Sequence, residues 1–125
     1  MPKRVLDVGQ CGPDHAAIRR FFAANFNDVE IEQAAACDDT LALLRRGHFD
    51  LVLVNRKLDE DYSDGIEIIR AIKRHPEFAA VPVMLITNYP EHQATAVTAG
   101  ALHGFGKLEY DLPATKEKIA TALGI

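Results

Sequence analysis

The chain has 125 residues, enough for one ordinary domain with a single hydrophobic core. Hydrophobic residues make up 48% of it and charged residues 26%, and the net charge of −4 argues against a nucleic-acid or anionic-membrane surface, since both require a basic patch. No apolar run reaches the ~20 residues of a membrane span, and the N-terminus lacks the apolar core of a signal peptide. Two cysteines, Cys11 and Cys37, fit a cytoplasmic protein with free thiols.

Strand and helix patterns alternate along the chain, and no linker or repeat interrupts them. The first strand is followed by a helix with Pro13 near its first turn. Two later strands are short and continuously apolar, as in buried parallel sheets. In chain order, strands are expected at 3–8, 29–34, 50–54, 81–86 and 101–105, and helices at 12–26, 37–47, 63–75, 90–100 and 113–124.

Five strand–helix units in a row predict one doubly wound α/β domain over residues 1–125, with a parallel sheet covered by helices on both faces. In such sheets the ligand or reaction site lies beyond the carboxyl ends of the strands. The residues at these ends are therefore the candidate site. They are Gly9, Gln10, Cys11, Asn55, Thr87, Asn88 and Lys107.

Four segments, in their order and spacing, give the chain a family resemblance. They are "PDH" at the start of the first helix, "FDLVLVN" followed by "DG", "VPVMLIT", and "AGALHGFGK". Together they resemble the receiver domain of bacterial response regulators, the CheY-like phospho-acceptor module of two-component signalling. The resemblance covers nearly the whole chain and implies a flavodoxin-like (βα)5 fold with strand order 2-1-3-4-5.

The family's chemistry implies a role for each strand end. An aspartate after the third strand accepts a phosphoryl group, and a Thr or Ser and a Lys bind the phosphoryl oxygens. By this resemblance Thr87 and Lys107 match the two phosphate-binding positions. Asn55, however, stands at the position of the acceptor aspartate.

Two further positions depart from the family pattern. The acidic pair that helps to hold Mg²⁺ falls on Gly9–Gln10 or on Gln10–Cys11, and neither choice contains a carboxylate. Gly104 stands where the family carries an aromatic residue that turns inward on activation.

These differences remove the groups that phosphorylation of a receiver requires. A carboxamide cannot act as the carboxylate nucleophile that forms an acyl phosphate, and Mg²⁺ loses its charged oxygen ligands. The sequence therefore predicts a pseudo-receiver with no catalytic residue, metal or cofactor. Lys107, left without the acceptor carboxylate, is expected to pair with the carbonyl oxygen of Asn55.

Two other functions remain open at this point. The chain could be a phosphorylatable receiver with a displaced acceptor, Asp59 or Asp7. It could also be a small-molecule or redox module that uses Cys11, at a helix N-terminus, and the pocket at the strand ends. The roles of Asp7, a charge inside a central strand, and of Cys11 are not fixed by the sequence.

We expect a stand-alone module that works through protein–protein contacts, with no nucleic acid or membrane involved. Its partners would be a histidine kinase or an output protein in trans, or a second copy in a homodimer. By resemblance, the contact surface is formed by the fourth helix, the fifth strand and the fifth helix. The candidate residues on it are His92, Gln93, Phe105, Leu108 and Tyr110.

Overall fold

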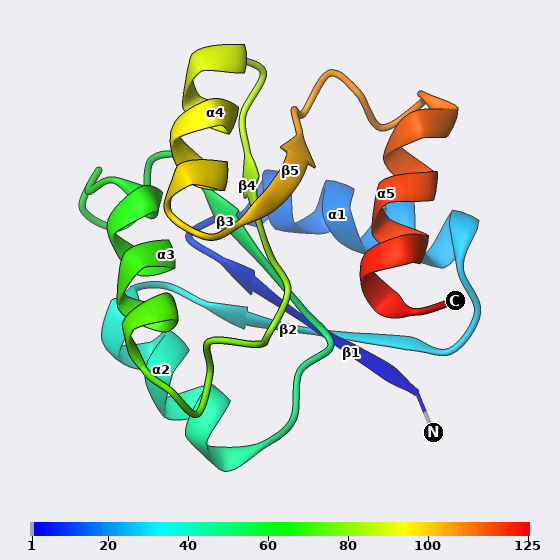
Figure 1. The fold of residues 1–125 in the computed structure, drawn as a ribbon. Coiled ribbons are helices and arrows are strands. Elements are labelled where there is room, and N and C mark those ends of the chain that lie inside the picture. Colours follow the sequence, from blue (N-terminus) through cyan, green and yellow to red (C-terminus); the bar gives the residue numbers. More distant parts are fainter. Residues whose placement is uncertain (1) are drawn as a thin grey trace.

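The computed structural model describes residues 2–125 and confirms every expected strand and helix, with ends that differ by at most two residues (Figure 1). The strands are β1 (Lys3–Val8), β2 (Val29–Ala34), β3 (Leu51–Asn55), β4 (Val83–Ile86) and β5 (Leu102–Phe105). The helices are α1 (Gly12–Asn25), α2 (Cys37–Arg46), α3 (Gly65–Arg74), α4 (Pro90–Thr98) and α5 (Pro113–Leu123).

The five strands form one parallel sheet in the order β2-β1-β3-β4-β5, which confirms the predicted topology. β1, β3 and β4 are central, and β2 and β5 are the edges. In Figure 1 the edge strand β5 lies between α4 and α5. Because all strands run the same way, their carboxyl ends meet at one end of the sheet.

Alternate strand residues divide the core into two layers, as the two-residue period of a strand requires. Leu6, Val52 and Leu85 point to the side covered by α2, α3 and α4, where they pack with residues such as Ile69. The opposite side is covered by α1 and α5. Its core is built by Val5, Leu51, Leu53, Met84, Ile86 and Phe105 from the sheet with Ile18, Phe21, Phe22, Ile119 and Leu123 from the helices.

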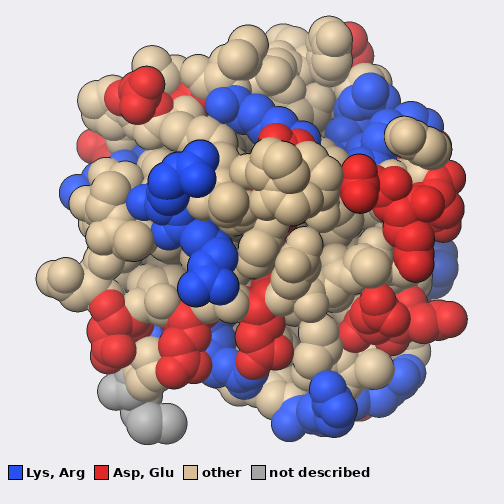
Figure 2. Space-filling view, turned by 180° about the vertical axis from the view of Figure 1, so that it is seen from behind, with Lys and Arg blue, Asp and Glu red and all other residues tan. Residues whose placement is uncertain are grey.

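The surface carries both signs of charge. Seen from behind in Figure 2, Lys and Arg side chains are interspersed with Asp and Glu side chains, and neither sign covers this face. Across residues 2–125, none of the helices combines the length and the apolar character needed to cross a membrane. Cys11 and Cys37 are both free thiols and both half-buried.

Replacing Leu53 with alanine tests the core. Its side chain is fully buried in the central strand β3, so Leu53→Ala should lower the free energy of unfolding by about 2–5 kcal/mol, measured by urea denaturation. Leu102→Ala is the matched control, because Leu102 is 45% exposed, and it should change stability by about 0.5 kcal/mol or less. Equal effects from the two variants would contradict this assignment of the core.

Candidate functional site

The ends of β3, β4 and β5 enclose a small open cavity of about 230 Å³. It brings together the three positions that the sequence singled out for phosphate chemistry, Asn55, Thr87 and Lys107. The other lining residues are Arg56, Lys57, Ile86, Asn88 and Tyr89. Asn88 stiffens the rim, because its Oδ1 accepts a hydrogen bond from the backbone N–H of Leu108.

Gly9 ends β1 in a conformation that a side chain would strain. Its φ is +80°, in the left-handed region that favours glycine. A Cβ atom built there would lie 2.3 Å from Leu58 Cδ2, and the Leu58 side chain is itself 2% exposed. A side chain at this position therefore requires a strained backbone and a shift of the Leu58 side chain.

The Asn55 side chain acts as a hydrogen-bond donor at the end of β3. Its Nδ2 donates to the carbonyl oxygens of Lys57 (2.7 Å) and Gly9 (3.3 Å). The Gly9 carbonyl also accepts the backbone N–H of Asp59 at 2.9 Å. An ionised aspartate at position 55 could not donate and would face two carbonyl oxygens.

Lys107 does not pair with Asn55, so that expectation is wrong. Its Nζ lies 2.6 Å from Oδ2 of Asp14, in the first turn of α1. This contact holds the pKa of the Asp14 carboxyl below its usual range. The Lys107 ammonium finds a full negative charge there, which attracts it more strongly than the neutral Asn55 amide. Asp14 stands in the "PDH" segment, and sequence reasoning gave it no role.

Asp7 is fully buried beneath the strand ends and pairs with His15 of α1. Asp7 Oδ2 and His15 Nδ1 are 2.6 Å apart, whereas Asp7 Oδ1 has no hydrogen-bond partner within residues 2–125. Burial raises the pKa of Asp7 to about 6, although the contact with His15 opposes the rise. Asp7 therefore has a structural partner, as a buried carboxylate needs.

The strand ends do not fit a Mg²⁺ ion. Mg²⁺ takes oxygen ligands in octahedral geometry, usually with one or two carboxylates. Here Gly9 has no side chain, Asn55 presents N–H donors to its neighbours, and the Asp14 carboxylate is bound to Lys107. No cluster of three His, Cys, Asp or Glu residues in the described part of the chain is arranged to hold a metal.

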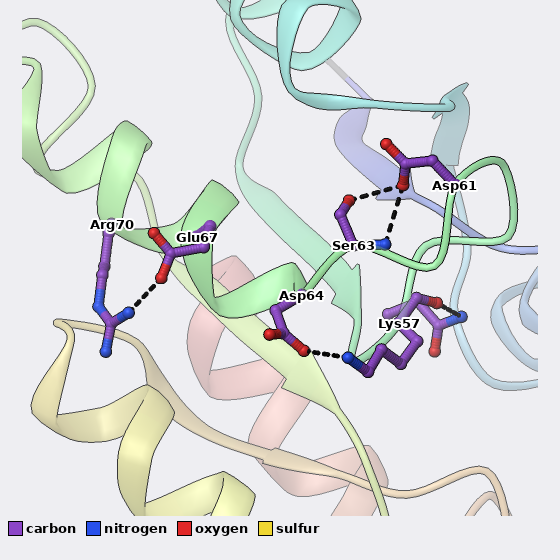
Figure 3. Close-up of polar contacts among 7 residues, drawn as sticks. Lys57, Asp61, Ser63, Asp64, Glu67 and Arg70 are labelled. Carbon is purple, nitrogen blue, oxygen red and sulfur yellow. Dashed lines mark hydrogen bonds and ion pairs between the residues drawn. The ribbon is translucent and has the colours of Figure 1, made fainter.

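The loop between β3 and α3 is fixed by its own polar contacts, shown in Figure 3. Lys57 and Asp64 pair at 2.6 Å across the base of the loop, and the same two residues form an antiparallel bridge. Ser63 donates its backbone N–H and its hydroxyl to Asp61 Oδ1. The loop thus holds Leu58 over Gly9.

Gly104 stands where the family resemblance places an aromatic switch residue, and the Gln93 side chain fills the space beside it. The backbone N–H of Gly104 donates to Gln93 Oε1 at 2.8 Å, and Gln93 Nε2 donates to the carbonyl oxygens of Leu85 (2.9 Å) and Thr87 (3.3 Å). A Cβ atom at Gly104 would lie 2.3 Å from the Leu85 oxygen. We call this arrangement the Gln93 bridge; it joins α4 to β4 and β5.

The expected contact surface needs a corresponding correction. Gln93 (4% exposed) and Phe105 (1%) are buried and cannot contact a partner directly. His92 and Tyr110 are half-buried, and Tyr110 packs against Phe105 with ring centroids 5.7 Å apart. Of the five expected residues, Leu108 is the exposed one, at 85%.

Cys11 precedes α1 and occupies its N-cap position, where its backbone oxygen accepts the N–H of His15. The thiol is half-buried, and it contributes, after Lys107, to the low pKa of the Asp14 carboxyl.

A test of the buried pair is the variant Asp7→Asn, whose amide oxygen can still accept a hydrogen bond from His15. Because the pKa of Asp7 is raised from 3.8 to about 6 in the fold, the ionised form is unfavourable, and the wild type loses stability as the pH rises between these values. Asp7→Asn should therefore be more stable than the wild type above pH 6, measured by urea denaturation. The difference should shrink towards pH 4; a difference independent of pH would contradict a raised pKa.

The Gln93 bridge can be tested with Gln93→Met, which keeps the side-chain length but leaves buried backbone groups without partners. We expect a loss of about 2–4 kcal/mol in the free energy of unfolding. Gln33→Met is the control, since Gln33 is exposed, and its effect should stay near 0.5 kcal/mol. A Gln93→Met protein as stable as the wild type would show that the bridge contributes little.

Comparisons with known proteins agree with this fold. A model of the response regulator receiver domain family matches residues 13–109. Among solved structures, the chain is similar to the signal receiver domain of a DNA-binding response regulator (merR) from Colwellia psychrerythraea 34H, with a TM-score of 0.82, 21% identity and coverage of 98% of this chain and 99% of that one. It is also similar to NtrX from Brucella abortus, with a TM-score of 0.78 and 22% identity over 99% of this chain and 28% of that one.

A third similar structure is the chemotaxis response regulator CheY4 of Vibrio cholerae, with a TM-score of 0.69, 20% identity and coverage of 98% of this chain and 99% of that one. At these identities the structures show the shared fold. No curated protein matches the chain by sequence.

Proposed function

Because the chain belongs to the family of response regulator receiver domains, modules of two-component signalling, we propose that it is a pseudo-receiver. It binds protein partners without accepting a phosphoryl group at the position after β3. The finding that carries this proposal is the donor role of Asn55, which bonds the carbonyl oxygens of Lys57 and Gly9. The Asn55 amide therefore has a structural role, because it holds two neighbouring backbone segments. It is more than an uncharged replacement for a nucleophilic aspartate.

The surroundings of Asn55 support the same conclusion. A side chain at Gly9 would strain the left-handed turn and displace the Leu58 side chain, and Lys107 is already paired with Asp14. Without carboxylates to hold a metal, the charge that develops on a transferring phosphoryl group lacks its usual counter-ion. The site thus lacks the nucleophile and the metal ligands together.

A displaced acceptor is disfavoured by the positions of both candidates. Asp7 is fully buried, so a phosphodonor has no access to its carboxylate. Asp59 is exposed but lines a cavity together with Asp39 and Glu60. Their negative charge would repel an incoming phosphoryl group.

Exposed apolar side chains gather where the family resemblance places partner contacts. Seven large hydrophobic residues are exposed in the described part of the chain, and five of them lie between residues 89 and 112. These five are Tyr89, Val97, Leu102, Leu108 and Leu112. Exposed apolar groups of this kind favour protein–protein contact, so α4, β5 and the loop before α5 are the proposed contact surface.

The test is incubation with Mg²⁺ and a small-molecule phosphodonor, followed by intact-mass measurement. We expect no phosphoryl adduct on the wild-type protein. We also expect no shift of its NMR signals when a beryllofluoride mimic of the phosphoryl group is added. A stoichiometric adduct that is stable in acid and labile in base would overturn the proposal, and the modified residue would identify a displaced acceptor.

The variant Asn55→Asp sharpens this test. It should remain unphosphorylated, because one restored carboxylate supplies no metal site, and it should lose about 1–3 kcal/mol of stability, because two hydrogen bonds to carbonyl oxygens are lost. Asn88→Asp is the matched control in the same cavity, since Asn88 uses its oxygen as an acceptor and an aspartate keeps that contact. Efficient phosphorylation of Asn55→Asp would show that the site is intact apart from one residue.

A further inference from the structure

The edge strand β2 has one side of its backbone free. It pairs with β1 along its whole length, from Val29 to Ala34, and none of the other described strands lies on its outer side. The pairing has no bulge, and the strand sequence "VEIEQA" contains no proline or lysine that would obstruct a further strand. At about 3.3 Å per residue the free edge is about 20 Å long. Such an edge can accept another strand through main-chain hydrogen bonds.

A groove of about 470 Å³ lies between this edge and α1. Its apolar wall is formed by the half-buried side chains of Phe26, Val29 and Ile31 together with the buried ring of Phe22. Val29 and Ile31 are two residues apart, so both point to the side of the sheet that α1 covers. A strand added beside β2 would direct every second side chain to the same side. The groove therefore suits the apolar side chains of such a strand.

The other face of β2 carries two carboxylates. Glu30 and Glu32 alternate with the groove residues and point to the side covered by α2, where their side chains are 62% and 42% exposed. In the described part of the chain both carboxylates pair with the same side chain, Arg4 of β1. One arginine balances only one of the two negative charges. This face of the edge therefore attracts a further cation.

These glutamates distinguish between two possible occupants of the edge. Two copies of this chain that paired through β2 about a twofold axis would place Glu30 and Glu32 of both copies on one face. Like charges across neighbouring strands destabilise the pair, whereas opposite charges stabilise it. The edge therefore disfavours a second copy and favours a strand that carries Lys or Arg.

From these features we infer that β2 is a docking edge for an extended segment of a partner protein in which apolar residues alternate with Lys or Arg. The segment adds a sixth strand to the sheet, with its apolar side chains in the groove and its basic side chains beside Glu30 and Glu32. The inference goes beyond the proposed function, because it adds a second contact surface at the opposite edge of the sheet from β5. It does not depend on the chemistry at Asn55.

The experiment is an NMR titration of the isotope-labelled protein with a capped peptide of four Val-Lys repeats. We expect saturable shifts of the backbone amide signals of β2 and of the residues that line the groove. The control peptide has the same composition, with all its lysines before its valines, so it cannot keep its lysines on one face of a strand. It should bind about fivefold more weakly or worse, because register and face are then lost.

Two pairs of variants locate the peptide on the protein, each checked for its fold by circular dichroism. Ala23→Gln fills the groove and should weaken binding about fivefold or more, whereas Ala24→Gln, at the next exposed position of α1, should leave it unchanged. Glu30→Lys should also weaken binding about fivefold or more, because attraction becomes repulsion. Glu117→Lys, which reverses an exposed charge on α5, should have no effect.

The inference fails if the peptide does not bind at millimolar concentration, if the two peptides bind equally, or if the shifts lie on α4 and β5 instead. Shifts of the β2 signals when the protein alone is diluted would show that a second copy covers the edge, and would also overturn it. A phosphoryl adduct in the phosphodonor test would leave all these outcomes unchanged. The two proposals can therefore fail independently.

Discussion

The backbone carbonyl of Gly9 makes the hydrogen bonds on which the arrangement of the strand ends depends. It accepts hydrogen bonds from the Asn55 side chain and from the backbone of Asp59, and it ties the end of β1 to the loop after β3. The left-handed turn at Gly9 aims this carbonyl, and Leu58 packs against the space that a side chain would need. An acidic residue at this position would strain the turn and displace the Leu58 side chain.

The charges of the site are balanced in pairs instead of being gathered around one ion. Lys107 pairs with Asp14 and Lys57 with Asp64, and the buried Asp7 is hydrogen-bonded to His15. Each pair joins two different elements or the two ends of one loop, so the pairing fixes positions without a metal. A cluster of carboxylates would instead repel itself when no cation is bound, and this arrangement avoids that cost.

The sequence was sufficient for the fold because the strand and helix periods are clear and the strand ends carry recognisable residues. It was also sufficient to bring Asn55, Thr87 and Lys107 to one place. It could not show that Lys107 would choose Asp14 over Asn55, since that choice depends on how α1 is rotated on the sheet. Gln93 was expected on the contact surface because of the family resemblance alone. Its burial depends on backbone groups of Leu85 in β4, Thr87 just after β4 and Gly104 in β5, which only the tertiary structure brings within reach.

The Gln93 bridge has a consequence for how a signal could leave this molecule. Because the amide of Gln93 bonds both β4 and β5, α4 cannot shift along the sheet without breaking buried hydrogen bonds. These hydrogen bonds therefore oppose a change in the shape of the proposed contact surface. Under the proposed function, the fraction of partner molecules bound to this surface then depends on the cellular concentrations of the two proteins. The signal is set by their synthesis and degradation.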